Sequence, residues 1–189
     1  MRVLVCSSEI YPYIKTGGLG DVTAALPPAL IAAGVDVRLF LPGYAKLLSK
    51  LKKAKTLIEF PVYFGAEKVR LIRGTLPEGI ITYVLDAPSF WDRSSAYVDE
   101  SGKDWADNHY RFAAFCRAIT DLPQYDPDWR ADIIHGNDWQ CGLIAPYIRL
   151  KGADTPKTIM TIHNIAYQGL FTPDVMPAIG IPGEMYTMQ

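Results

Sequence analysis

The sequence predicts an α/β fold built around a parallel sheet. Short, nearly continuous apolar runs alternate along the chain with longer stretches of helical character, and this alternation is typical of parallel strands joined by crossover helices. The runs nearest the N-terminus are apolar almost throughout, as strands covered on both faces are. Polar residues follow several of the runs directly, and ligands of such sheets bind beyond the carboxyl ends of the strands.

The opening of the chain predicts a strand–helix–strand unit. A β-branched apolar run at 2–7 indicates a buried strand, 20–33 a helix and 35–41 a second buried strand. This spacing fits a crossover between parallel neighbours. Pro27 and Pro28 lack the N–H that a helix interior needs, so we expect them to bend or split the helix.

The remainder of the chain continues the alternation of strands and helices. A turn containing Gly65 separates the next two runs, which are candidates for a hairpin. A polar, aromatic loop follows the third run and extends to about residue 103. The expected elements are strands at 57–64, 69–75 and 80–85, a helix at 104–121, a strand at 132–135, a helix at 138–150 and a strand at 158–163.

The charge pattern excludes two classes of partner. The 189 residues include 19 Lys and Arg and 20 Asp and Glu, which gives a net charge of −1 with no polybasic run. Charge alone therefore holds neither a nucleic acid nor an anionic membrane surface. No stretch approaches the roughly 18 apolar residues of a membrane span. We expect no nucleic-acid partner and no membrane partner.

Cysteine usage and the N-terminus indicate a cytoplasmic protein, or a stromal one if a transit peptide has been removed. The three cysteines include no Cys-x-x-Cys pair, which argues against a disulfide framework or zinc site and favours a reducing compartment. The apolar run at the N-terminus is too short for a signal peptide.

Polar side chains gather where the expected strands end. Because the carboxyl ends of parallel strands lie together, we expect groups that are distant in sequence to meet there. These residues are Ser8, Glu9, Asp86, the run 135–138, His163 and Asn164. Their placement predicts a ligand site at the carboxyl end of the sheet.

The loop from Lys15 to Asp21 is the most informative local motif. Its paired glycines let the backbone come close to a bulky anion, and the N–H groups at the start of the next helix attract negative charge. Lys15 adds a cation that can reach a phosphate or a sugar hydroxyl. The loop lacks both the Gly-Lys-Ser/Thr ending of a Walker A loop and the Gly-x-Gly-x-x-Gly spacing of dinucleotide folds. A tight structural turn is the alternative interpretation.

His163 and Asp138 each have a structural alternative as well. A lone histidine at a strand end is often a hydrogen-bonded structural residue, and aspartate before a helix is a favoured N-cap. Together with His135 they suggest a metal triad, but no His-x-x-x-His helix pair supports one. We therefore expect neither a metal nor a cofactor.

Several motifs, taken in order, carry a resemblance to a known family. They are SEIYP at 8–12, KTGGLGDV at 15–22, ALP at 25–27, DAP at 86–88 with DR at 92–93, HGNDW at 135–139 and TIHNIAYQG at 161–169. They cover essentially the whole chain. In these stretches the chain resembles the glycogen and starch synthases of glycosyltransferase family 5.

The resemblance implies the GT-B fold, in which two Rossmann-like domains face each other across a cleft. It places residues 1–189 in an incomplete N-terminal domain, with the C-terminal domain absent from these residues. The implied reaction transfers glucose from ADP-glucose, or UDP-glucose, to the non-reducing end of an α-1,4-glucan with retention of configuration. Because such catalysis needs both walls of the cleft, we expect the fragment alone to be inactive and to require the missing domain in cis.

The resemblance also implies roles for the glycine loop. Lys15, Gly17 and Gly18 would lie against the diphosphate and glucose of the donor, and Asp21 would lie nearby at the helix start.

Further roles are implied for residues at other strand ends. Asp138 and Asn164 would contact the donor glucose or position its neighbours, and Tyr97 matches a family tyrosine at the cleft. His163 would hold the transferred glucose, while its main-chain carbonyl stabilises positive charge at the anomeric carbon. The spacing after Arg93 is one residue shorter than in common bacterial members.

Two other functions compete with this interpretation. A non-catalytic glucan- or nucleotide-binding module would use the same half of the fold. A Rossmann oxidoreductase is disfavoured, because the glycine spacing differs and no acidic residue closes the strand at 35–41.

Overall fold

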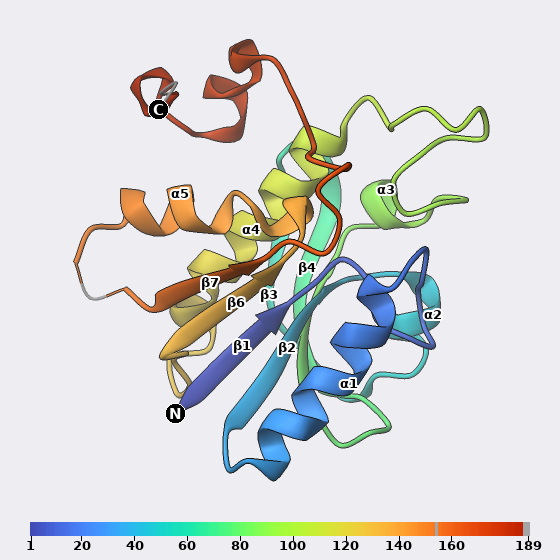
Figure 1. Ribbon diagram of the computed structural model, residues 1–189, viewed down its shortest axis with the longest axis vertical. Coiled ribbons are helices and arrows are strands. Elements are labelled where there is room, and N and C mark those ends of the chain that lie inside the picture. The colour runs from blue at the N-terminus through green and yellow to red at the C-terminus, as the bar shows by residue number, and fades with distance from the viewer. Residues whose placement is uncertain (154, 187–189) are drawn as a thin grey trace.

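The computed structural model describes residues 1–153 and 155–186, which form one sheet with helices on both faces (Figure 1). The strands are β1 (Arg2–Cys6), β2 (Asp36–Pro42), β3 (Lys52–Tyr63), β4 (Ala66–Thr75), β5 (Ile81–Asp86), β6 (Ile133–Asn137) and β7 (Lys157–Thr161). The helices are α1 (Leu19–Ala32), α2 (Ala45–Leu48), α3 (Pro88–Trp91), α4 (Asn108–Tyr125) and α5 (Ile144–Leu150). Short 3₁₀ turns lie at Trp139–Cys141, Pro173–Val175, Pro177–Ile179 and Gly183–Met185.

The seven strands follow the order β3-β4-β5-β2-β1-β6-β7. From β5 to β7 all neighbours are parallel, whereas β3, β4 and β5 pair antiparallel. The expected α/β fold is confirmed, and so is the hairpin, which turns at Phe64 and Gly65 between β3 and β4. The sheet is mixed rather than wholly parallel, because a two-residue turn reverses the chain where a crossover would preserve its direction.

The order of the strands creates a switch point beside β1. The chain passes from β1 to β2 on one side and later returns to β6 on the other side. Right-handed crossovers therefore put α1 on one face and α4 with α5 on the opposite face (Figure 1). Ligands of open α/β sheets bind at such a switch point, beyond the carboxyl ends of the strands.

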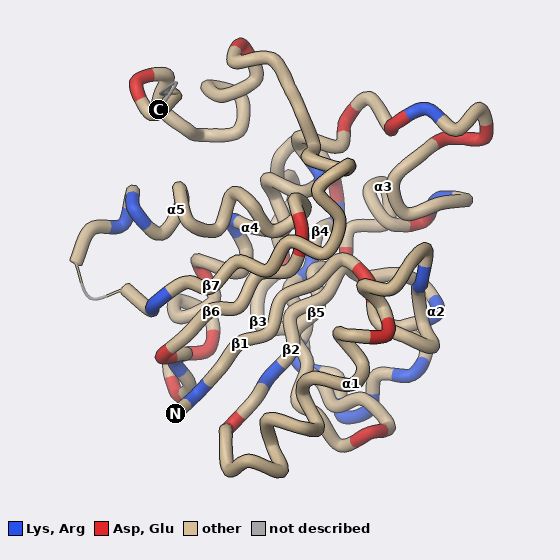
Figure 2. The backbone as a smooth tube through the Cα atoms, viewed as in Figure 1, with Lys and Arg blue, Asp and Glu red and all other residues tan. Residues whose placement is uncertain are grey.

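The core fills the space between the sheet and these helices. Its fully buried members come from central strands and from the inner face of α4; they include Val5, Leu39, Phe40, Val84 and Phe115. All three cysteines are buried free thiols within it. Among residues 1–153 and 155–186, no helix combines the length and apolarity needed to cross a membrane. Lys and Arg are interspersed with Asp and Glu along the chain (Figure 2).

Two helices differ from expectation. α1 is not split at Pro27 and Pro28 but continues through both. Two adjacent prolines remove backbone hydrogen bonds at only one place in the helix, and the φ angle of proline is compatible with a helix. Packing of α1 against β2 provides most of the stability of a helix of this length. The single helix expected at 138–150 is instead a 3₁₀ turn at Trp139–Cys141 followed by α5.

Candidate functional site

The strand ends bring the predicted site residues to the switch point of the sheet. In the parallel register Cys6 of β1 pairs with Gly136 of β6, and Asn137 of β6 pairs with Thr161 of β7. The segments that continue from these strands therefore start side by side. They hold Ser8 and Glu9 after β1, Asp138 after β6, and His163 with Asn164 after β7.

The glycine loop, residues 15–21, lies between β1 and α1 and leaves open space above Gly17 and Gly18. A Cβ built on Gly17 or Gly18 would meet no atom within 4 Å. Neither residue has a left-handed φ, and Gly18 is at φ −69°. The protein's own packing therefore does not require glycine at these positions, which weakens the alternative of a purely structural turn.

Lys15 and Asp21 form an exposed ion pair across this loop. The Lys15 Nζ lies 2.8 and 2.6 Å from the two carboxylate oxygens of Asp21, and the side chains are 43% and 54% exposed. Exposed pairs contribute about 0–1 kcal/mol to stability. An incoming anion can therefore draw Lys15 away from Asp21 at little cost.

Glu9 anchors the glycine loop by hydrogen bonds to Thr16 and Gly17, a role that the sequence did not reveal. Its carboxylate is 2% exposed and accepts hydrogen bonds from the Thr16 N–H at 2.7 Å, the Thr16 hydroxyl and the Gly17 N–H at 3.4 Å. The only sequence signal was its place directly after the first strand. Its contacts arise because the chain turns back, with Ile10 bridged to Ile14.

Tyr97 links Glu9 to the neighbouring strand ends. Its hydroxyl donates to Glu9 Oε1 at 2.7 Å and lies 2.7 Å from the Ser8 hydroxyl. Burial, reinforced by nearby Tyr44 and Glu9, raises the pKa of Tyr97 well above its ordinary value, so the phenol keeps its proton. Its ring lies 6.5 Å from that of Trp139, centroid to centroid. The predicted site residue Tyr97 is thus joined to the glycine loop through Glu9.

Asp138 holds the segment after β7 instead of capping a helix. Its side chain makes no cap hydrogen bond; Oδ1 accepts from the backbone N–H of His163 at 2.8 Å and that of Asn164 at 3.5 Å. The N-cap alternative is therefore wrong. Asp138 has φ 59° and ψ 176°, a region that costs a non-glycine residue about 1–3 kcal/mol and that clusters at functional sites.

His163 is held through both its backbone and its ring. Its Nε2 lies 3.0 Å from Oδ1 of Asn137, a residue that is 1% exposed. The structure thus brings together Asp138, His163 and Asn164, as the sequence predicted.

His135 pairs with Thr161 on the neighbouring strand β7. Its Nε2 lies 2.7 Å from the threonine hydroxyl. Burial, and to a lesser extent the charge of His163, lowers its pKa below the ordinary value of 6.5. Within the part of the chain that the structure describes, no group of three or more His, Cys, Asp or Glu residues is arranged to hold a metal ion.

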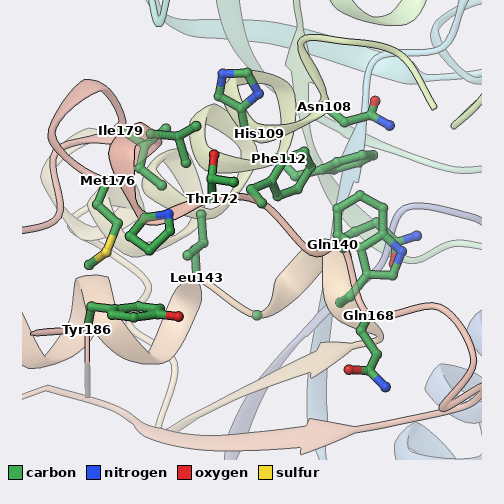
Figure 3. Close-up of a pocket in the computed structure, with 16 residues that line it drawn as sticks. Asn108, His109, Phe112, Gln140, Leu143, Gln168, Thr172, Met176, Ile179 and Tyr186 are labelled. Atoms are coloured by element: carbon green, nitrogen blue, oxygen red, sulfur yellow. The ribbon is translucent and has the colours of Figure 1, made fainter. Parts of the chain in front are cut away.

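A cavity of about 240 Å³ lies next to the site and shares Trp139 as a wall (Figure 3). Side chains of α4, the turn after β6 and the C-terminal segment surround it, among them His109, Phe112, Leu143 and Met176. Lys15, Asp138 and His163 are not part of its lining. The cavity is therefore distinct from the polar site at the strand ends.

Comparison with known proteins agrees with this geometry. The sequence profile described as starch synthase catalytic domain matches residues 2–189. Glycogen synthase of Paramagnetospirillum magneticum is 46% identical over the whole chain, which covers 39% of that protein. Glycogen synthase 2 of Rhizobium meliloti is 42% identical, with 39% of its length covered. The chain thus spans about two fifths of the length of these relatives.

A solved structure resembles the fold as well as the sequence. The catalytic domain of starch synthase IV from Arabidopsis thaliana, bound to ADP and acarbose, superposes with a TM-score of 0.78 at 30% identity, over 97% of this chain and 38% of that one. Together with the profile match, this similarity establishes that the chain belongs to the starch synthase catalytic domain family.

Proposed function

We propose that the protein is a retaining glucosyltransferase that transfers glucose from ADP-glucose, or UDP-glucose, to the non-reducing end of an α-1,4-glucan. In this proposal, residues 1–189 form an incomplete N-terminal domain and one wall of the cleft. The observation that carries the proposal is the open space above Gly17 and Gly18, on a loop anchored by the buried Glu9. The starch synthase IV relative has ADP and acarbose bound, which supports a nucleotide sugar and a glucan as the ligands here.

The glycine loop forms the donor side of the proposed site. Without side chains at Gly17 and Gly18, a diphosphate can approach the backbone closely. Lys15 then exchanges its solvent-exposed partner Asp21 for the phosphate oxygens. A flexible ammonium group suits this exchange, because it acts as a point charge with rotatable donors.

The ends of β6 and β7 form the glucose side. Asp138 fixes the backbone of His163 and Asn164, so the carbonyl of His163 has a defined direction. A fixed carbonyl dipole aimed at the anomeric carbon stabilises positive charge as the glycosidic bond to the diphosphate breaks. Asn164 and Tyr97 complete the contacts to sugar hydroxyls in this proposal.

The remaining parts of the proposal concern what lies outside these residues. A C-terminal domain in cis supplies the opposite wall, and the 189-residue chain alone is inactive. The reaction uses no metal or other cofactor. The buried free thiols suit a reducing compartment, so we place the protein in the cytoplasm, or in the plastid stroma if it is of plant origin.

Glucan elongation by the complete gene product, assayed with ADP-glucose and UDP-glucose, tests the proposal. Loss of one charged contact to the reacting group costs about 100-fold in kcat/KM, so Lys15→Ala should show a fall of that order. Lys52→Ala, on the exposed strand β3, is the matched control and should leave kcat/KM unchanged. Equal activity of the two variants would refute the role of Lys15. Binding of nucleotide or glucan without any turnover would favour the non-catalytic module instead.

A further inference from the structure

The hydrogen bonds around Asn137 determine which way its side-chain amide points. Its Nδ2 lies 3.0 Å from the carbonyl oxygen of Cys6 and 3.4 Å from that of His135. Carbonyl oxygens only accept hydrogen bonds, so the NH₂ group must face them. In the reverse orientation, Oδ1 would face the carbonyl oxygens of Cys6 and His135, and none of these three oxygens can donate a hydrogen bond. The NH₂ group would then face the ring of His163. Oδ1 therefore faces His163.

This orientation fixes the proton on the ring of His163. The ring nitrogen opposite Oδ1 is Nε2, at 3.0 Å, and an amide oxygen only accepts. Nε2 must therefore carry a hydrogen. In a neutral imidazole the other nitrogen, Nδ1, is then without a hydrogen and acts as an acceptor.

We infer that Asn137 is a positioning residue that holds His163 as the Nε2–H tautomer, with Nδ1 free to accept a hydrogen bond from a ligand hydroxyl. Within residues 1–153 and 155–186, Nδ1 of His163 makes no hydrogen bond. A neutral acceptor suits a sugar hydroxyl, which donates a proton, and cannot donate to a phosphate oxygen. The assignment rests on the proposed function only for the identity of that ligand.

The surroundings of Asn137 allow little rearrangement. Asn137 is 1% exposed and ends strand β6. The carbonyl of Cys6 also lies 3.4 Å from the thiol of Cys141, and Asp138 holds the backbone N–H of His163 at 2.8 Å. Ring and amide are thus fixed from independent directions, which is what a defined tautomer requires.

Nitrogen-15 NMR of the labelled 189-residue chain at pH 8 tests this inference without any sugar or nucleotide. The chain has three histidines, and the spectrum of a His163→Gln variant assigns the His163 signals. We expect His163 to carry its hydrogen on Nε2. Asn137→Ala removes the acceptor and should change the ratio of tautomers by about five-fold, the effect of one hydrogen bond.

Thr161→Val is the matched control, because it removes the hydroxyl partner of His135 on the adjacent strand. It should alter the signals of His135 and leave those of His163 in place. A hydrogen on Nδ1 of His163 in the wild-type chain overturns the inference, even if the Asn137→Ala variant does not fold. An unchanged tautomer ratio in a folded Asn137→Ala variant also overturns it. Neither result depends on whether the protein transfers glucose.

Discussion

The glycine loop leaves its charged side chains in solvent, whereas the polar side chains at the ends of β6 and β7 are hydrogen-bonded to other strands and loops. The side chains of Lys15 and Asp21 pair with each other across the loop and are about half exposed. Asn137 is buried, and Asp138 bonds to the backbone of the segment after β7. The two regions border the same site but differ in how firmly their functional groups are placed.

The difference matches what each region does in the proposed reaction. A departing diphosphate changes its charge and position, so a mobile cation such as Lys15 can follow it. Charge that develops at the anomeric carbon instead needs a dipole that is already oriented. The energy needed to reorient the dipole during the reaction would offset the stabilisation it gives to the transition state. Glu9 bonds both to the loop and to Tyr97, whose ring lies 6.5 Å from that of Trp139 just after β6.

The largest predicted difference in stability is between a methyl group added at Gly169, in the segment after β7, and one added at Gly18, in the glycine loop. At Gly169, φ is 58° and a Cβ would lie 2.0 Å from the ring of Trp139, so Gly169→Ala should lower the free energy of unfolding by about 3 kcal/mol or more. At Gly18 a Cβ meets nothing, so Gly18→Ala should change it by less than about 1 kcal/mol. Urea denaturation followed by circular dichroism measures both. Comparable losses in the two variants would contradict the open space above the loop.

Glu9→Gln should loosen the glycine loop while the ends of β6 and β7 stay in place. The carboxylate accepts from the Thr16 and Gly17 N–H groups at Oε2 and from the Thr16 and Tyr97 hydroxyls at Oε1. A carboxamide keeps only one of these acceptor oxygens, so one set of donors loses its acceptor, and a mismatched buried donor costs about 2 kcal/mol. We expect that loss of stability, together with faster amide exchange at Thr16 and Gly17. Glu59→Gln, on the exposed side of β3, is the control. Unchanged exchange at Thr16 would argue that Glu9 is not the anchor.

Two substitutions at Asp138 separate backbone strain from the hydrogen bond to His163. Both Asp138→Ala and Asp138→Gly remove the carboxylate, but only glycine relieves the cost of φ 59° and ψ 176°. The glycine variant should therefore be more stable than the alanine variant by about 1–3 kcal/mol. Asp138→Asn retains an oxygen for the His163 N–H and should stay close to the wild-type stability. Equal stability of the alanine and glycine variants would show that the backbone relaxes.

The fold was predictable where local pattern and tertiary context agree. The apolar runs marked all seven strands. Central strands such as β1 and β2 are apolar because both of their faces are covered, whereas β3 and β7 are largely exposed and carry shorter apolar stretches. The helices α2 and α3 were missed, since each has four residues and so short a segment shows no periodicity. The direction of β3 and β4 depended on the tight turn at Gly65, which the sequence indicated only as a possible hairpin.

The grouping of polar residues at the strand ends was predictable from the sequence, but their supporting contacts were not. Strand ends identified Asp138, His163 and Asn164, because the sheet register brings β6 and β7 side by side. Glu9 was visible only as a polar residue after a strand, since its partners Thr16 and Tyr97 reach it through chain folding. The positive φ of Asp138 could not be predicted from the sequence, because aspartate at this position is equally typical of a helix N-cap.

The smallest predicted effect is a pH dependence of folding stability that arises from the partly buried His135. Burial lowers the pKa of His135 in the folded chain below its ordinary value of 6.5, so the unfolded chain takes up this proton more readily. The resulting contribution to stability is intact above pH 6.5 and is lost as the pH falls below 6.5 through the folded-state pKa. Urea titrations between pH 5 and pH 8 should show this slope in the wild type, and His135→Gln should reduce it. A slope that the substitution leaves unchanged would assign the effect to other groups.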